Sequence, residues 1–166
     1  MKKLILVAGP AGIGKSSYCE TYRQNHPEEN VQIISSDEIR KRLTGSYRIF
    51  PTDKNGRRDM SPVYEMMVEE AETLSEKNPN VTVMLDTTML EDDRRLYFLN
   101  RLPLFEERDL KLMKLHDYTL CLKRNKQRNP EKWVPDEVII DMTKNYFDPS
   151  EEVMKRLTNV EDVYLD

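Results

Sequence analysis

Short apolar runs alternate with longer stretches of helical periodicity along the whole sequence. Apolar runs bounded by turn-forming residues predict strands at 3–8, 31–35, 81–85, 110–115 and, more weakly, 160–165. Between them, apolar residues recur with helical spacing at 15–24, 37–43, 62–76, 91–105, 118–128, 135–147 and 149–157. Alternating strands and helices form a parallel sheet covered on both faces, because parallel pairing needs right-handed crossovers. We therefore predict a three-layer α/β fold.

The amount of apolar sequence fits one domain. The chain has 166 residues, of which 38% are hydrophobic, and this suits a single core spanning 1–166. One segment, 44–61, is longer than an ordinary connection and contains Gly45, Pro51 and Gly56 among polar residues. We expect a loop with a functional role there, because long structureless loops are uncommon in compact domains.

Charge and cysteine usage narrow the classes of function. The net charge of −4 argues against sequence-independent coating of a polyanion but leaves room for a local basic groove. Cys19 and Cys121 lie in periodic apolar segments without CxxC spacing, which predicts core thiols in a reducing cytoplasm. The first apolar run, 4–8, is too short for a membrane span, and no signal-peptide cleavage pattern follows it. We expect a soluble, cytoplasmic protein without a membrane partner.

A glycine-rich segment lies between the first predicted strand and the first predicted helix. It reads Gly-Pro-Ala-Gly-Ile-Gly-Lys-Ser and matches the phosphate-binding pattern G-x-x-x-x-G-K-[ST] throughout. In this pattern backbone N–H groups point at the β-phosphate, the lysine reaches the β- and γ-phosphates, and the hydroxyl binds Mg²⁺. The residues that we expect to bind ATP here are Gly9, Gly12, Ile13, Gly14, Lys15, Ser16 and Ser17.

Other readings of the glycine-rich segment fit less well. A dinucleotide-binding G-x-G-x-x-G pattern fails, because Ala11 occupies the position of its second glycine. A glycine-rich turn with an accidental lysine has no reason to lie between a strand and a helix. We therefore expect ATP and Mg²⁺, rather than a nicotinamide or flavin, as the cofactors.

Two aspartates stand where predicted strands end. Asp37 follows the second strand and Asp86 ends the third, at the sheet edge where open α/β folds bind ligands. Phosphoryl transfer to a hydroxyl needs a base for the attacking group and a carboxylate for Mg²⁺. We assign the base to Asp37 and the metal to Ser16 and Asp86. The alternatives are an N-cap for the helix 38–43 in the case of Asp37, and an ordinary turn residue in the case of Asp86.

Two further groups of basic residues are candidates for binding phosphates. Arg124 and Arg128 are four residues apart, so we expect them to share a helix face. Such a pair fits a lid, at about 118–134, whose arginines neutralise the transferring phosphoryl group, although a solvated basic face is also common. The second group lies between residues 40 and 58, where Asp53 is the only acid, and its members are Arg40, Lys41, Arg42, Arg48, Lys54, Arg57 and Arg58. We expect the acceptor to lie along this segment, with a solvated basic loop as the alternative.

Over nearly its full length the chain resembles the kinase domain of phage-type polynucleotide 5′-kinases, within the zeta-toxin-like group of P-loop kinases. The motifs that carry the resemblance are Met1 to Leu6 before the phosphate loop, Ser36-Asp37-x-x-Arg40, Asp86-Thr87-Thr88 with Arg94-Arg95, and Lys123-Arg124-Asn125-x-x-Arg128 followed by Val134-Pro135. Thr88 stands where that kinase carries asparagine, and the loop 44–61 does not align.

The resemblance implies specific roles for the candidate residues. It implies a five-stranded parallel sheet with the third strand beside the first, and a helical lid. The residue that matches Asp37 is the general base, and the one that matches Arg40 contacts the acceptor-side phosphate. The arginines that match Arg124 and Arg128 belong to the lid and bind ATP. The catalytic set is then Lys15, Asp37, Arg124 and Arg128, and the substrate-binding set is Asp37, Arg40, Asp86, Thr87 and Thr88.

The sequence thus predicts ATP- and Mg²⁺-dependent phosphorylation of a hydroxyl, with the 5′-hydroxyl of a polynucleotide or nucleotide as the leading acceptor. A small-molecule acceptor, such as the sugar nucleotide of zeta toxins or another metabolite, stays open. A nucleotide-binding module without phosphotransfer is the alternative from another class, and it would not need a strand-end base together with lid arginines. The sequence does not indicate the oligomeric state.

Overall fold

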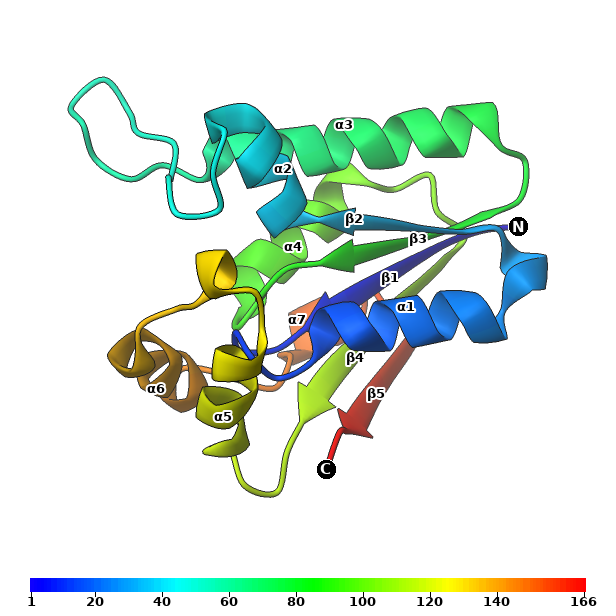
Figure 1. The fold of residues 1–166 in the computed structure, drawn as a ribbon. Coiled ribbons are helices and arrows are strands. Elements are labelled where there is room, and N and C mark those ends of the chain that lie inside the picture. The colour runs from blue at the N-terminus through cyan, green and yellow to red at the C-terminus, as the bar shows by residue number, and fades with distance from the viewer.

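The computed structural model describes residues 1–166 as a sheet between two layers of helices (Figure 1). Its five strands all run parallel, in the order β2-β3-β1-β4-β5. The strands are β1 (Lys2–Ala8), β2 (Val31–Ser35), β3 (Val81–Asp86), β4 (Glu107–Lys114) and β5 (Asn159–Tyr164). The predicted α/β class, the five-stranded parallel sheet and the pairing of the third strand with the first are confirmed.

Every predicted helix is present, with some differences at the ends. The helices are α1 (Lys15–Asn25), α2 (Ser36–Thr44), α3 (Ser61–Lys77), α4 (Asp92–Arg101), α5 (Leu120–Gln127), α6 (Asp136–Lys144) and α7 (Glu151–Met154). The later helices are shorter than periodicity suggested. In α4 the cause is Pro103, because the residue before a proline avoids the helical region, and Leu102 caps the helix with φ −123°.

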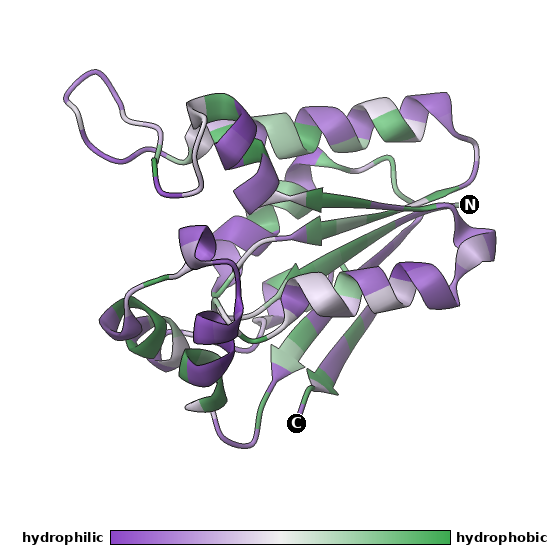
Figure 2. Cartoon of the chain, viewed as in Figure 1, coloured by the Kyte–Doolittle hydropathy of each residue, from purple (hydrophilic) through white to green (hydrophobic).

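The sheet separates two apolar cores. Side chains of successive strand residues point to opposite faces. In β1, Leu4 and Leu6 join a core formed with α2, α3, α4 and α7, whereas Ile5 and Val7 join a core formed with α1, α5 and α6. Figure 2 shows the corresponding pattern, with apolar residues concentrated on the strands. Cys19 and the second cysteine are buried free thiols, as expected. None of the helices combines the length and the apolar character that crossing a membrane requires.

The carboxyl ends of the central strands bring the functional segments together. β1 leads directly into the glycine-rich loop and α1. The last residues of β1 lie beside the end of β3, with Val7 opposite Asp86. On the other side of β3, Ser35 of β2 is also opposite Asp86. Helix α2 starts at the next residue. The strand order alone therefore places Asp86 next to the phosphate loop and the start of α2 next to Asp86.

The segment between α2 and α3 is a loop that projects from the body of the molecule (Figure 1). Its tip turns at Gly56, where φ is +76°, a value that suits glycine. Asp53 accepts backbone hydrogen bonds from Asn55 and Arg57, and a bridge between Thr52 and Arg58 closes the turn. The loop predicted at 44–61 is confirmed, and it is held by its own hydrogen bonds.

Candidate active site

The glycine-rich loop wraps the start of α1. Gly12 has φ +82°, and a Cβ on it would lie 2.5 Å from the carbonyl oxygen of Cys121, so only glycine fits. Gly14 caps α1 in the left-handed region, with φ 112°, and no side chain bonds the first N–H groups of the helix. Unpaired N–H groups at a helix start form an anion site. At the other end of the loop, the Gly9 N–H donates to the Thr88 carbonyl at 2.9 Å.

Lys15 lies inside this loop. Its Nζ donates to the carbonyl oxygens of Gly9 and Pro10 at 2.9 and 3.1 Å. Burial lowers the pKa of Lys15, and the carboxylates of Asp86 and Asp37 oppose that shift. The ammonium is thus held by two neutral carbonyls close to two acids. Phosphate oxygens bind an ammonium more strongly than neutral carbonyls do, so arriving phosphates would be favoured partners for Lys15.

Ser16 and Asp86 form the candidate Mg²⁺ site. The Ser16 hydroxyl donates to Asp86 Oδ2 at 2.7 Å, and Asp86 is only 5% exposed. Burial raises the pKa of Asp86, while Lys15 and the hydrogen bond from Ser16 oppose the shift. Oxygen ligands suit Mg²⁺, which usually takes one or two protein ligands and completes its shell with phosphates and water. The Ser16 hydroxyl and the Asp86 carboxylate are two oxygen ligands of this kind, so they fit a Mg²⁺ that is bound together with the nucleotide.

Asp37 lies in the first turn of α2. The cap of this helix is Ser35, whose hydroxyl accepts from the Glu38 N–H at 3.5 Å, so the capping role considered for Asp37 is wrong. Its carboxylate is instead 3.1 Å from Arg40 and 3.4 Å from Arg128. The Asp37 side chain stays 36% exposed. A carboxylate that is oriented by cations and still accessible can accept a proton from a bound hydroxyl.

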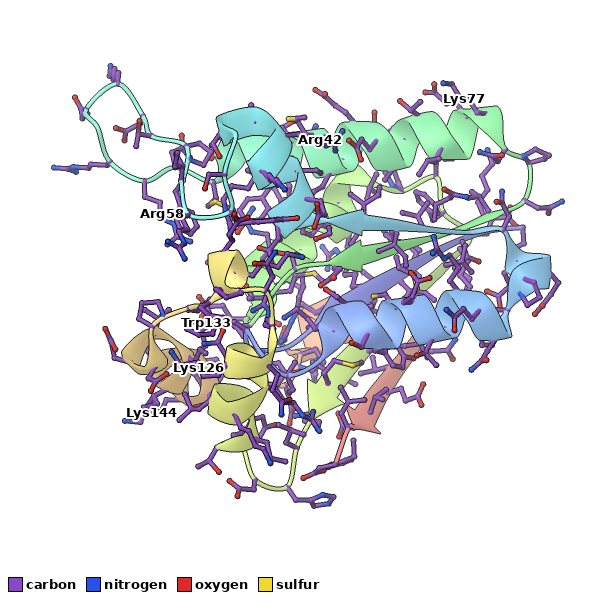
Figure 3. All side chains as sticks on the ribbon, viewed as in Figure 1. Arg42, Arg58, Lys77, Lys126, Trp133 and Lys144 are labelled. Atoms are coloured by element: carbon purple, nitrogen blue, oxygen red, sulfur yellow. The ribbon has the colours of Figure 1, made fainter.

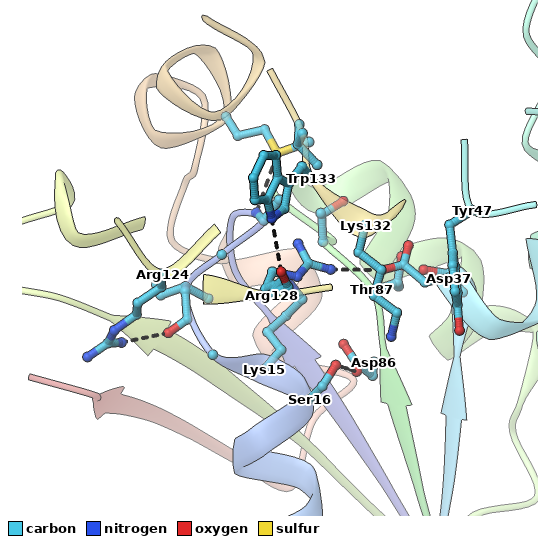
Figure 4. A pocket seen from close by; sticks show the side chains of 18 of the residues that line it. Lys15, Ser16, Asp37, Tyr47, Asp86, Thr87, Arg124, Arg128, Lys132 and Trp133 are labelled. Atoms are coloured by element: carbon cyan, nitrogen blue, oxygen red, sulfur yellow. Dashed lines mark hydrogen bonds and ion pairs between the residues drawn. The ribbon is translucent and has the colours of Figure 1, made fainter. Parts of the chain in front are cut away.

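The two arginines of the predicted lid point to different parts of the site (Figure 4). Helix α5 ends at Gln127, and Arg128 has an extended backbone with ψ 168°, so the prediction that Arg124 and Arg128 share a helix face is wrong. Arg124 donates to the carbonyls of Ile13 and Leu165 at 2.9 and 2.6 Å. Arg128 reaches Asp37 on the other side of the phosphate loop, and its charge acts on both Lys15 and Asp86.

One cavity of about 1070 Å³ collects these groups. Its lining includes every predicted site residue except Gly9, which instead bonds the loop after β3. The lining residues among the predictions are Gly12, Ile13, Gly14, Lys15, Ser16, Ser17, Asp37, Arg40, Asp86, Thr87, Thr88, Arg124 and Arg128. The phosphate loop and Asp37 therefore open into the same space.

Further residues tie the lid segment to α2. Glu38 accepts from the Tyr47 hydroxyl at 2.6 Å and from Lys132 at 3.2 Å. The bond to Glu38, and then burial, raise the pKa of Tyr47 to about 12. Trp133 donates to the backbone carbonyl of Arg128 at 2.9 Å. No motif predicted these contacts: the bond between Lys132 and Glu38 joins residues 94 positions apart, and the two shorter-range bonds follow no standard spacing.

A buried arginine supports the loop after β3. Arg95 is fully buried, and its guanidinium donates to the carbonyls of Met89, Leu90 and Phe147 at 3.0, 3.1 and 2.7 Å. Met89 has φ +40°, which is unusual for a residue with a side chain. Arg95 thus holds a strained backbone directly after Thr88, the residue that bonds the phosphate loop. The sequence placed Arg95 in a motif but did not reveal this role.

Comparison with known proteins agrees with this architecture. Residues 4–149 match a family model described as an AAA domain. The chain belongs to this AAA domain family. No curated protein matches it in sequence.

Solved structures share the fold of this AAA domain protein at low identity. A gluconokinase from Sinorhizobium meliloti 1021 has a TM-score of 0.62 and 18% identity, covering 98% of this chain and 83% of that one. Kti12 from Chaetomium thermophilum, in complex with ADP-AlF3, has a TM-score of 0.63 and 14% identity, covering 98% and 89%. A chain of the Pnkp1/Rnl/Hen1 RNA repair complex has a TM-score of 0.70 and 15% identity, covering 94% and 46%. The chain spans less than half of that last relative. These likenesses establish a kinase-like P-loop fold.

The position of Arg128 leads to a first prediction. Arg128→Lys keeps the charge but loses the planar fork that can bond Asp37 and a phosphoryl group together. We expect kcat to fall by about 10-fold or more, since a charge-assisted hydrogen bond contributes roughly 1.5–3 kcal/mol. Steady-state ADP release measures the effect. The control is Lys123→Arg, which is on the same segment but outside the cavity lining. Activity of Arg128→Lys within twofold of the parent would indicate that Arg128 is a solvated surface residue without a role in catalysis.

Proposed function

We propose that this protein transfers the γ-phosphate of ATP to a hydroxyl group, most specifically the 5′-hydroxyl of a polynucleotide or nucleotide. The observation that carries the proposal is the common cavity: an accessible carboxylate, Asp37, opens into the same space as a complete phosphate loop. Arg128 connects the two, because it contacts Asp37 and lines the same cavity as Lys15 and the phosphate loop. A nucleotide-binding module without chemistry would not need this connection.

On the nucleotide side, the loop N–H groups and Lys15 bind the phosphates of ATP. Ser16 and Asp86 hold Mg²⁺, which when bound neutralises charge on the phosphates. Arg124 orders the nucleotide end of the cavity by fixing the carbonyls of Ile13 and Leu165. The lid segment 118–134 covers the triphosphate, and Arg128 stabilises charge on the transferring group.

On the acceptor side, Asp37 takes the proton of the attacking hydroxyl while Arg40 fixes the orientation of its carboxylate. Thr87 and Thr88 directly follow β3 and line the cavity that Asp37 shares with the phosphate loop. Positioning the hydroxyl in line with the γ-phosphate provides most of the rate enhancement, because phosphoryl transfer leaves little covalent chemistry to the protein.

The charge of the acceptor side supports a phosphate-bearing acceptor. Of the basic residues between 40 and 58, the ones that line the cavity are Arg40, Arg48 and Arg58. Others are engaged elsewhere: Arg42 pairs with Glu70, and the Lys41 ammonium lies over the Tyr47 ring. The basic segment identified in the sequence is therefore partly a surface feature, and three of its arginines bring positive charge to the cavity.

A panel of acceptors tests the proposal. We expect phosphate transfer from labelled ATP to a nucleoside 3′-monophosphate or a short 5′-hydroxyl oligonucleotide, and far less to the bare nucleoside. Raising the salt concentration should chiefly increase the KM of the acceptor, because salt screens exposed charges. The Lys15→Ala variant, prepared in the same way, controls for contaminating kinases. Equal use of the bare nucleoside, or a preference for an uncharged metabolite, would favour the small-molecule alternative.

A further inference from the structure

Arg40 has few donors to spare for a substrate. Its Nε and one terminal nitrogen donate to the Tyr47 carbonyl at 3.2 and 2.7 Å, and its other terminal nitrogen donates to Asp37 at 3.1 Å. The Arg40 side chain is only 11% exposed. Its contacts fix the base and the start of the loop between α2 and α3. Another group must therefore receive the phosphate of an acceptor.

Arg58, unlike Arg40, has a guanidinium that is available to a ligand. It lies on the projecting loop, and Figure 3 shows its side chain pointing from that loop toward the lid. Its guanidinium carbon lies 3.5 Å from the centre of the Phe50 ring, and that of Arg40 lies 4.3 Å from the same ring. Arg58 lines the main cavity and has no carboxylate partner. Burial, and then the charge of Arg40, lower the pKa of Arg58, so an anion at this point would relieve repulsion between two cations.

Arg94 repeats this arrangement beside a second, smaller cavity. Its guanidinium carbon lies 3.6 Å from the centre of the Tyr64 ring and 5.0 Å from that of Tyr97. No carboxylate pairs with Arg94, which lines a second cavity of about 290 Å³. The two cavities share Tyr64 and Thr88 as lining residues, so they adjoin at the acceptor side of the site.

We propose that Arg58 and Arg94 form a two-point track for successive phosphates, so that the acceptor is a 5′-hydroxyl oligonucleotide carrying at least two of them. This inference rests on the proposed function and specifies its substrate. A guanidinium that lies over an aromatic ring keeps its N–H groups free in its own plane, where they can bond a phosphate with two parallel hydrogen bonds. Phe50 and Tyr64 hold each fork in place at little cost in conformational entropy.

Acidic residues at the second cavity limit which anions can bind there. Glu91 and Asp93, both exposed, line it beside Arg94. Their charges repel a free anion, so an isolated phosphate ion has little reason to bind there. A phosphodiester tethered to an acceptor that already occupies the Arg58 site arrives at high effective concentration. The track therefore selects an anion that is part of a chain, which distinguishes an oligonucleotide from a small metabolite with one phosphate.

Two acceptors and matched variants test the track. The acceptors are a nucleoside 3′-monophosphate and a dinucleotide with a terminal 3′-phosphate, which carry one and two phosphates. We expect a kcat/KM about 10-fold higher for the dinucleotide in the parent, the size of one charge-assisted contact. Arg94→Gln should remove that advantage and leave the monophosphate unaffected. Arg58→Gln should lower kcat/KM about 10-fold or more for both acceptors. Arg57→Gln, one residue away and outside both cavities, should leave both within twofold.

The results separate failure of the track from failure of the proposed function. Equal use of the two acceptors by the parent, or an equal loss for both on Arg94→Gln, would overturn the track while the kinase assignment stands. No transfer to either acceptor, with transfer to an uncharged metabolite, would overturn both. Thermal unfolding checks the fold of each variant. If Arg94→Gln unfolds because it loses its contacts with Tyr64 and Tyr97, Arg94→Lys provides the second measurement, and it should retain part of the preference for the dinucleotide.

Discussion

Replacing Lys15 by alanine is expected to lower ATP turnover by at least about 10²–10³-fold, the loss that follows removal of one preorganised donor to a transition state. The ammonium is held between the Gly9 and Pro10 carbonyls, next to Asp86. It can therefore move onto phosphate oxygens in both the ground state and the transition state. Steady-state ADP release with saturating acceptor measures the effect.

The fold should survive this change. The lost contacts are two hydrogen bonds to loop carbonyls, each contributing about 0.5–1.5 kcal/mol, and removing a buried ammonium also removes its desolvation cost. We expect the melting temperature to shift by only a few degrees. Lys15→Met, which keeps the length of the side chain, should be as inactive as Lys15→Ala, whereas Lys54→Ala on the exposed loop should behave as the parent. Near-normal turnover by both Lys15 variants would contradict a P-loop kinase.

Most of the fold could be predicted because the relevant signals are local. Apolar runs and turn residues set the strands, and the right-handed crossover rule makes consecutive parallel strands into a covered sheet. The same rule explains why Asp37 and Asp86, each at the end of a strand, were expected at one edge. The structure confirms that the two aspartates lie at the same edge of the sheet, since Ser35, two residues before Asp37, is paired with Asp86.

The ends of helices were less predictable, and one of them matters for chemistry. Periodicity continues through Arg128, but Pro130 pushes Asn129 out of the helical region, and the chain is already extended at Arg128. The four-residue spacing from Arg124 then no longer implies a common face. The early end of α5 is what turns Arg128 toward Asp37. A helix that ran one turn further would have placed both arginines on one helix face.

The acceptor side could not be predicted in detail because its contacts are between distant residues. Arg94 packs on Tyr64, and Lys132 pairs with Glu38, without any fixed spacing in the sequence. Composition revealed that the segment from 40 to 58 is basic, but not that Arg40 would be occupied by the Tyr47 carbonyl while Arg58 is free. Which arginine can receive a ligand depends on hydrogen-bond partners, and these follow only from the folded chain.

The sharpest test of the proposed chemistry is Asp37→Asn. Asparagine keeps the shape of the side chain and an oxygen that can accept from Arg40 or Arg128, but it cannot take the proton of the attacking hydroxyl. We expect kcat to fall by roughly 10²–10⁴-fold, the usual contribution of a general base. ATP affinity should change little, because Ser35 rather than Asp37 caps α2 and the ligands that we propose for Mg²⁺ are Ser16 and Asp86. Single-turnover kinetics and nucleotide titration separate the two quantities.

Comparison with Asp86→Asn makes this test decisive. Asp86 bonds Ser16 at 2.7 Å, so its replacement should weaken Mg²⁺-dependent ATP binding and lower turnover together, whereas Asp37→Asn should affect turnover alone. Asp162→Asn, an exposed aspartate on β5, controls for the loss of one negative charge and should behave as the parent. If ATP binding is instead lost in Asp37→Asn and kept in Asp86→Asn, the two roles must be exchanged: the carboxylate between Arg40 and Arg128 would then be the metal ligand, and the buried one beside Ser16 would be the base.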